Sequence, residues 1–152
     1  MEIPEAKLIK SEILLRDMDL TEDVKMTRKS LVRWIALSLG LISPKESRQS
    51  ILSLLEAILF YHVKEKREPN YNDIQDYLRS HSIDLNEKTT RYHLTQLKKS
   101  KVLENSRGTY KIAGFDGSNP ADSLERLYKS RCNTAFSNIK DAFSALEKLH
   151  TE

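Results

Sequence analysis

The sequence predicts a mainly α-helical protein that carries one small β-hairpin and ends in a long helix. Apolar residues recur at the three- and four-residue spacing of helices over most of the 152 residues. Helix-capping residues such as Asn86 stand immediately before several of these stretches. The pattern changes at one place, where two short extended segments flank a turn that ends in Gly108. A chain of this length forms one domain, or a small domain with an added arm, and needs no disulfide or metal to fold.

Residues 1–47 are expected to form an N-terminal extension that contains one helix. Thr27 is expected to cap this helix and Gly40 to end it. Residues 1–26 are acidic, and their pattern leaves three roles open: covering the core, docking a partner, or remaining partly disordered. The apolar side of the helix is expected to hold Leu31, Trp34, Ile35, Ser38 and Leu39.

The second helix is predicted to begin at Ser43 and Pro44 and to run to about Lys64. Ser43 suits the N-cap, Pro44 suits the first helical position, and Glu46 is spaced as the capping partner of Ser43. Its buried side is expected to hold Ile51, Leu54, Leu55, Ile58, Leu59 and Val63.

Two shorter helices follow. Asn70, after a break at Pro69, is expected to cap a helix that buries Ile74, Tyr77 and Leu78. A turn over residues 80–86 is expected to plug the core with Ile83 or Leu85. Asn86 then caps a helix over residues 87–99, whose core-facing side is predicted to be Thr90, Leu94 and Leu97.

The hairpin and the last helix complete the predicted order. Strands are expected over residues 102–104 and 109–112, around a turn over residues 105–108. A glycine-containing loop leads to Asn119 and Pro120, which are expected to begin a final helix over residues 119–150.

The small net charge of +3 conceals an uneven distribution. Residues 1–26 carry a net −3, residues 27–85 a net +2, residues 86–111 a net +5 and residues 116–152 a net −1. The basic excess is therefore concentrated in the helix over residues 87–99 and the hairpin that follows it. Such a concentration indicates a surface that binds nucleic acid.

The order of helix, short helix, turn, basic helix and hairpin is that of a known DNA-binding fold. Residues 89–103 read T-T-R-Y-H-L-T-Q-L-K-K-S-K-V-L. This stretch resembles the recognition helix and following strand of the winged helix-turn-helix superfamily of transcription regulators. The resemblance covers residues 48–113. It implies a DNA-binding domain whose recognition helix, residues 87–99, enters the major groove, while a wing over residues 104–111 contacts the backbone or the minor groove.

The side chains of this region suit that role. If Thr90, Leu94 and Leu97 face the core, the residues between them face outward. Arginine and glutamine can pair with base edges, threonine can donate to a base or touch a thymine methyl group, and lysines near the helix end can hold phosphates. Tyr92 is expected either to contact DNA or to pack partly against the core. The candidate DNA-binding residues are Lys88, Thr89, Arg91, Tyr92, Thr95, Gln96, Lys98, Lys99, Lys101 and Arg107.

A second resemblance concerns the residues ahead of this domain. Arg33-Trp34, Ser38 to Leu41 and Ser43 to Arg48 are similar to the euryarchaeal archaellum regulators, a family of small winged-helix activators of motility operons. This resemblance implies an archaeal protein that binds double-stranded DNA upstream of a promoter and helps to recruit the basal transcription machinery. The corresponding location is the cytoplasm, at the nucleoid.

Other functions are weighed against this one. A winged helix can also serve as a protein–protein adaptor in a transcription or replication assembly, and RNA binding would need more stacking aromatics than Tyr92 and Tyr110. No enzyme is expected, because no nucleophile stands beside a base and no phosphate loop is present. No cofactor is expected. The four histidines have no metal-ligand spacing, and the lone Cys132 is expected to be an inert packing thiol. No stretch is apolar enough to predict a membrane span.

The last helix is expected to pack against its counterpart in a second copy and so form a homodimer. In one version of this arrangement the Trp34 helix packs there as well. Its apolar face, from Leu127 round to Phe136, covers about half the cylinder, which is wider than one neighbour requires. Because the spacing along the helix is not a strict heptad, no long coiled coil is predicted. The alternative is that the helix folds back onto its own domain.

Overall fold

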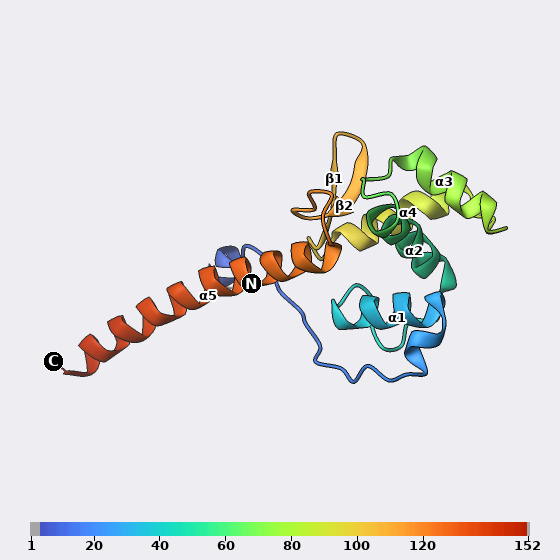
Figure 1. The fold of residues 1–152 in the computed structure, drawn as a ribbon. Coiled ribbons are helices and arrows are strands. Elements are labelled where there is room, and N and C mark those ends of the chain that lie inside the picture. Colours follow the sequence, from blue (N-terminus) through green and yellow to red (C-terminus); the bar gives the residue numbers. More distant parts are fainter. Residues whose placement is uncertain (1–3, 152) are drawn as a thin grey trace.

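The computed structural model describes residues 4–151, and it is mainly helical with one two-stranded antiparallel hairpin (Figure 1). Four helices and the hairpin form the body, and the last helix leaves it and projects outward. Two short 3₁₀ helices, η1 (Pro4–Leu8) and η2 (Val24–Met26), precede them. In chain order the main elements are α1 (Arg28–Ser38), α2 (Gln49–Val63), α3 (Tyr71–Ser80), α4 (Glu87–Lys98), β1 (Leu103–Ser106), β2 (Thr109–Ile112) and α5 (Pro120–Thr151).

Helix α2 is the centre of the body and contacts α1, α3, α4 and β2. Because neighbours surround it, it buries residues on nearly every side, including Leu52, Tyr61 and His62 outside the predicted stripe. Val63, which was predicted to be buried, is 50% exposed where the helix ends.

The predicted start of α2 at Ser43 and Pro44 is wrong, because the helix begins at Gln49. Glu46 does not reach back to cap Ser43. Its carboxylate instead accepts from the backbone N–H of Arg48 at 3.0 Å and from the Arg48 guanidinium at 2.8 Å. The chain makes a turn at residues 44–45 and is extended at Arg48, so the helix starts only after the Glu46–Arg48 pair.

The predicted caps of α3 and α4 are confirmed. Asn70 and Asp73 form a reciprocal capping box at the start of α3, and the Asn86 side chain accepts from the Thr89 N–H at 2.8 Å. Both Ile83 and Leu85, in the connection between the two helices, pack against the core. Each helix therefore begins where its capping residue predicts.

The hairpin has a tighter turn than predicted. Ser106 pairs with Thr109, so the turn consists of Arg107 and Gly108 alone rather than residues 105–108. Both have positive φ angles, +54° and +82°, as a two-residue turn of the I′ type requires. The hairpin is fastened to the body because the Tyr110 N–H donates to the Pro69 carbonyl at 2.8 Å.

Residues 9–20 form an extended strap that contacts α1, which is one of the arrangements that the acidic sequence leaves open. Arg16 binds carbonyls at the end of α1, at 2.6 Å to Leu37 and 3.2 Å to Ile42. The Trp34 indole N–H donates to the Asp19 carbonyl at 2.8 Å. The strap therefore covers α1 on the side away from α2.

Helix α1 is consequently packed on two sides, and its predicted buried side is only partly right. Val32, Ala36 and Ser38 are buried, whereas Trp34 and Ile35 are half-buried. Of the predicted set, Ser38 alone is fully covered.

Helix α5 begins as predicted, with the Asn119 side chain accepting from the Ala121 N–H at 2.9 Å. Ser123 and Tyr128 are buried against the body, and the Tyr128 hydroxyl donates to the strap at the Leu14 carbonyl, 3.0 Å away. From Cys132 onward every described residue of α5 is exposed. None of the helices in residues 4–151 combines the length and the apolar character needed to cross a bilayer.

Candidate nucleic-acid interface

Helix α4 is fixed to the body by one side only. Thr90, Leu94 and Leu97 are buried as predicted, and His93 joins them with 3% exposure. The Thr90 hydroxyl donates to the Asn86 carbonyl at 2.9 Å, and His93 Nε2 lies 2.8 Å from the Ser50 hydroxyl of α2. These contacts set the rotation of the helix about its axis, so the opposite side faces solvent.

The exposed side of α4 presents one line of polar residues. Lys88, Tyr92, Thr95 and Lys99 follow each other at four- and three-residue spacing and are all exposed. We call these four residues the α4 stripe. Tyr92 is 51% exposed. The Thr95 hydroxyl donates to the Arg91 carbonyl at 3.0 Å, so it keeps its methyl group and its acceptor capacity for a partner.

Arg91 lies beside the stripe and is already engaged. Its Nε donates to Glu87 at 2.9 Å, and its guanidinium lies 4.2 Å from the centre of the Tyr71 ring of α3. The Glu87 carboxylate raises the pKa of Arg91 further above its ordinary value. The predicted base-reading arginine is therefore held in place from two sides. Its hydrogen bond to Glu87 must break before it can contact a base.

The other predicted DNA-binding residues of α4 and of the segment after it differ in exposure and position. Thr89, Gln96 and Lys98 are half-buried at the edges of the exposed side. Lys101 is exposed, but it follows the helix with a positive φ of +61°, and its ammonium donates to the Lys10 carbonyl of the strap at 3.1 Å. Lys101 therefore lies apart from the α4 stripe.

The hairpin carries one free cation at its tip. Arg107 is exposed, and no carboxylate of residues 4–151 pairs with it. Lys111, further down the hairpin, lies 3.4 Å from Glu68 and 3.8 Å from Glu104 and is largely neutralised. Apart from Lys101, which lies away from the stripe, the cations of this region that no carboxylate of residues 4–151 neutralises are therefore Lys88, Lys98, Lys99 and Arg107.

Arg48 was not predicted as a site residue, although it lies beside the stripe. Its guanidinium binds both carboxylate oxygens of Glu46, at 2.8 and 3.0 Å, and lies next to the Tyr92 hydroxyl. The pair lowers the pKa of Glu46 to about 2. Nothing in the sequence signals this position, because Arg48 approaches Tyr92 only through the packing of the turn before α2 against α4.

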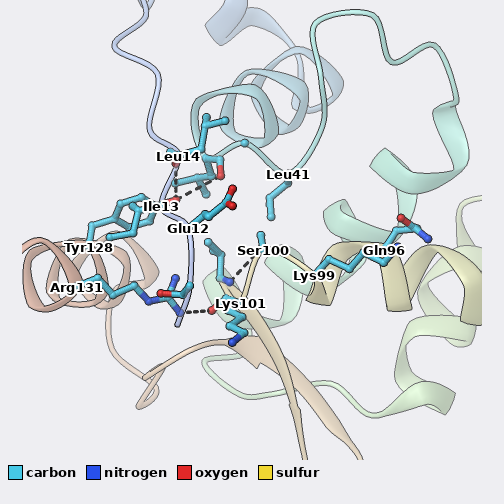
Figure 2. Close-up of a pocket in the computed structure, with 14 residues that line it drawn as sticks. Glu12, Ile13, Leu14, Leu41, Gln96, Lys99, Ser100, Lys101, Tyr128 and Arg131 are labelled. Carbon is cyan, nitrogen blue, oxygen red and sulfur yellow. Dashed lines mark hydrogen bonds between the residues drawn. The ribbon is translucent and has the colours of Figure 1, made fainter. Parts of the chain in front are cut away.

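A hollow of about 540 Å³, lined by both polar and apolar residues, lies at the C-terminal end of α4 (Figure 2). The strap, the end of α1, the segment after α4 and the start of α5 border it. Gln96 of α4 and Lys99, which caps its C-terminus, line it, and Arg131 of α5 donates to the Lys101 carbonyl at 2.6 Å along its edge. These contacts join the strap, the end of α4 and α5 into one unit next to the Lys99 end of the α4 stripe.

A buried histidine anchors the hairpin from below. His62 of α2 is fully buried, accepts from the Ile112 N–H at 3.1 Å and stacks on Phe115 with ring centres 4.0 Å apart. Burial lowers the pKa of His62 to about 4, against a smaller opposing effect of Glu68. His62 is thus neutral near pH 7 and supplies a ring nitrogen that holds β2 in place.

Two further observations concern the lone cysteine and the possible metal ligands. Cys132, which was expected to be a packing thiol, is exposed, because α5 has left the body at that point. Among residues 4–151, no group of histidine, cysteine and acidic side chains has the arrangement of a metal site.

Comparison with known proteins adds no relative. No family model, no curated protein and no solved structure matches the chain.

Proposed function

We propose that the protein is a sequence-specific regulator of transcription that binds double-stranded DNA through α4 and the hairpin. The observation that carries the proposal is the α4 stripe, Lys88, Tyr92, Thr95 and Lys99, on a helix whose other side is fully packed. A helix held by one side, with polar and cationic residues on the other, has the form that enters a major groove. The winged helix-turn-helix resemblance of residues 48–113 supports the same assignment.

The residues divide into two chemical roles. Lys88 and Lys99, at the two ends of the stripe, hold phosphates on either side of the groove, while Tyr92 and Thr95 between them face the bases. Gln96, at the edge, reaches an adenine if the helix enters deeply. Arg107 is the cation of the hairpin tip and holds a phosphate or enters the minor groove.

Arg91 also contacts a base, once its guanidinium releases Glu87 and binds the base instead. Its bond to Glu87 is exposed on both sides, with side-chain exposures of 54% and 69%, so the bond contributes little stability and is easily broken. A guanine offers the guanidinium two acceptors, O6 and N7, in place of the single Glu87 carboxylate oxygen that it binds in the free protein. The Tyr71 ring beneath keeps the guanidinium extended during the exchange.

The regulatory part of the proposal follows from the resemblances. A protein of this kind acts in the archaeal cytoplasm, at the nucleoid, by binding near a promoter and contacting the basal transcription machinery. Selection of bound sequences from fragmented archaeal DNA, followed by protection mapping, identifies the site. Enrichment of one sequence family near promoters is the expected result.

Substitutions on the selected site test the two roles. Arg91→Ala should weaken binding by about 1–3 kcal/mol and relax the base preference at one position. Lys99→Ala should weaken binding to every sequence by a similar factor. Lys148→Ala removes the same charge near the far end of α5 and is the matched control, which should bind as the wild type does. If Lys99→Ala and Lys148→Ala have the same affinity, α4 is not the contact, and the role of a protein–protein adaptor takes its place.

A further inference from the structure

We infer that residues 132–150 of α5 form a two-stranded coiled coil with a second copy of this chain. Every residue of this part of α5 is exposed, and the helix projects away from the body (Figure 1). It nevertheless carries large apolar side chains, which are 43–73% exposed: Phe136, Ile139, Phe143, Leu146 and Leu149.

The wide apolar face expected from the sequence consists of two adjoining stripes, one on each part of the helix. Leu124, Leu127 and Tyr128 form the first stripe, which packs on the strap and the body. The second stripe is rotated from the first by roughly 100° at 3.6 residues per turn. The helix therefore leaves the body with a second, uncovered contact line.

The second stripe has the spacing of a coiled coil. Cys132, Phe136, Ile139, Phe143 and Leu146 follow each other at intervals of four, three, four and three residues. Residues 135–141 read A-F-S-N-I-K-D and residues 142–148 read A-F-S-A-L-E-K, which is a seven-residue repeat. The spacing of α5 as a whole is not a heptad, because its first part follows the body, but the free part is one. Heptad spacing of apolar residues, present here over two repeats, is the pattern by which two helices pack along a shared seam.

Charge and area favour a second copy as the partner. Residues 132–150 contain Lys140 and Lys148 against Asp141 and Glu147, so identical helices meet without net repulsion. At roughly 200 Å² for a whole large apolar side chain, the observed exposures leave about 100 Å² on each of the four large seam residues, Phe136, Ile139, Phe143 and Leu146. Two copies together then cover about 800 Å² of apolar surface, which is the size of a small, weak interface. A helix that lies on a membrane would instead carry a strongly basic polar face.

The test measures the mass of the whole protein in solution without DNA, so it is independent of the proposed function. Sedimentation under reducing conditions, which keeps Cys132 from linking two copies, should give twice the chain mass of 17.6 kDa at tens of micromolar. Phe143→Asp should raise the dissociation constant by at least about 100-fold, because it places a charge in the seam of both copies. Ser144→Asp adds the same charge one residue away, off the seam, and should remain a dimer.

The variants also report on folding. Phe143 is 67% exposed, so the unfolding of the body, followed by Trp34 fluorescence, should be the same in Phe143→Asp and Ser144→Asp. A wild type that stays monomeric at 100 µM overturns the inference, and so does a dimer that Phe143→Asp leaves intact. Monomers that bind anionic lipid vesicles through α5 overturn it as well.

Discussion

Replacing Arg107 by asparagine should make the protein more stable and at the same time a weaker DNA binder. Arg107 is the first residue of the two-residue hairpin turn and has a φ of +54°. This left-handed conformation costs an ordinary L-residue about 1–2 kcal/mol, whereas asparagine tolerates it well. Asparagine followed by glycine is also the preferred pair for a turn of the I′ type, and Gly108 already occupies the second position.

The gain in stability is not offset by lost contacts. The Arg107 side chain is exposed and forms no ion pair with residues 4–151. Arg107→Asn should therefore raise the free energy of unfolding by about 1 kcal/mol, which corresponds to a rise of roughly 2–4 °C in the Tm of a chain of this length. Scanning calorimetry and urea unfolding with Trp34 fluorescence measure the change.

The binding effect should have the opposite sign. The loss of one cation at the hairpin tip should weaken DNA binding several-fold at moderate salt and reduce the salt slope by about 1. Arg107→Lys is the matched control, because it keeps both the charge and the conformational cost. A variant that is more stable but binds DNA as tightly as the wild type would remove the hairpin tip from the interface, and an unchanged or lower Tm would refute the argument about turn strain.

Two further predictions concern the packing behind the interface. Because the folded pKa of His62 is about 4 against 6.5 when unfolded, its neutral form stabilises the fold fully above pH 6.5. Lowering the pH from 7.5 to 4.5 should cost roughly 2–3 kcal/mol in urea unfolding, and His62→Gln should lose much less over the same range. Gly40→Ala should lower the Tm, because its φ is +70° and the added Cβ would meet Leu14 of the strap at 2.8–2.9 Å. Gly114→Ala, with a φ of +84° and open space around it, has the conformational cost alone and should lower the Tm less.

The elements that follow local rules could be predicted from the sequence. Asn70, Asn86 and Asn119 begin their helices because a capping side chain needs only the next two or three residues to act. The outward side of α4 was also predictable, because Thr90, Leu94 and Leu97 leave one choice of buried face. The start of α2 was not, because the Glu46–Arg48 pair competes with the cap that Ser43 suggests.

The contacts that depend on distant residues could not be read from the pattern. Arg91 rests on Tyr71, twenty residues earlier, and Lys101 turns toward Lys10 of the strap. The strap itself has no helical or strand period, since hydrogen bonds from Arg16 and Trp34 hold it rather than an apolar face. The two stripes of α5 could be separated only once the body showed which of its apolar residues it covers.

The salt dependence of binding to double-stranded DNA tests the central claim most directly. Lys88, Lys98, Lys99 and Arg107 are the accessible cations of the interface, so the logarithm of the association constant should fall linearly with the logarithm of salt concentration, with a slope of roughly −3 to −4 per protomer. Lys99→Ala should reduce that slope by about 1, and Lys148→Ala should leave it unchanged. Binding that is absent, or that does not weaken as salt rises, would contradict the assignment of α4 and the hairpin as a DNA-binding surface.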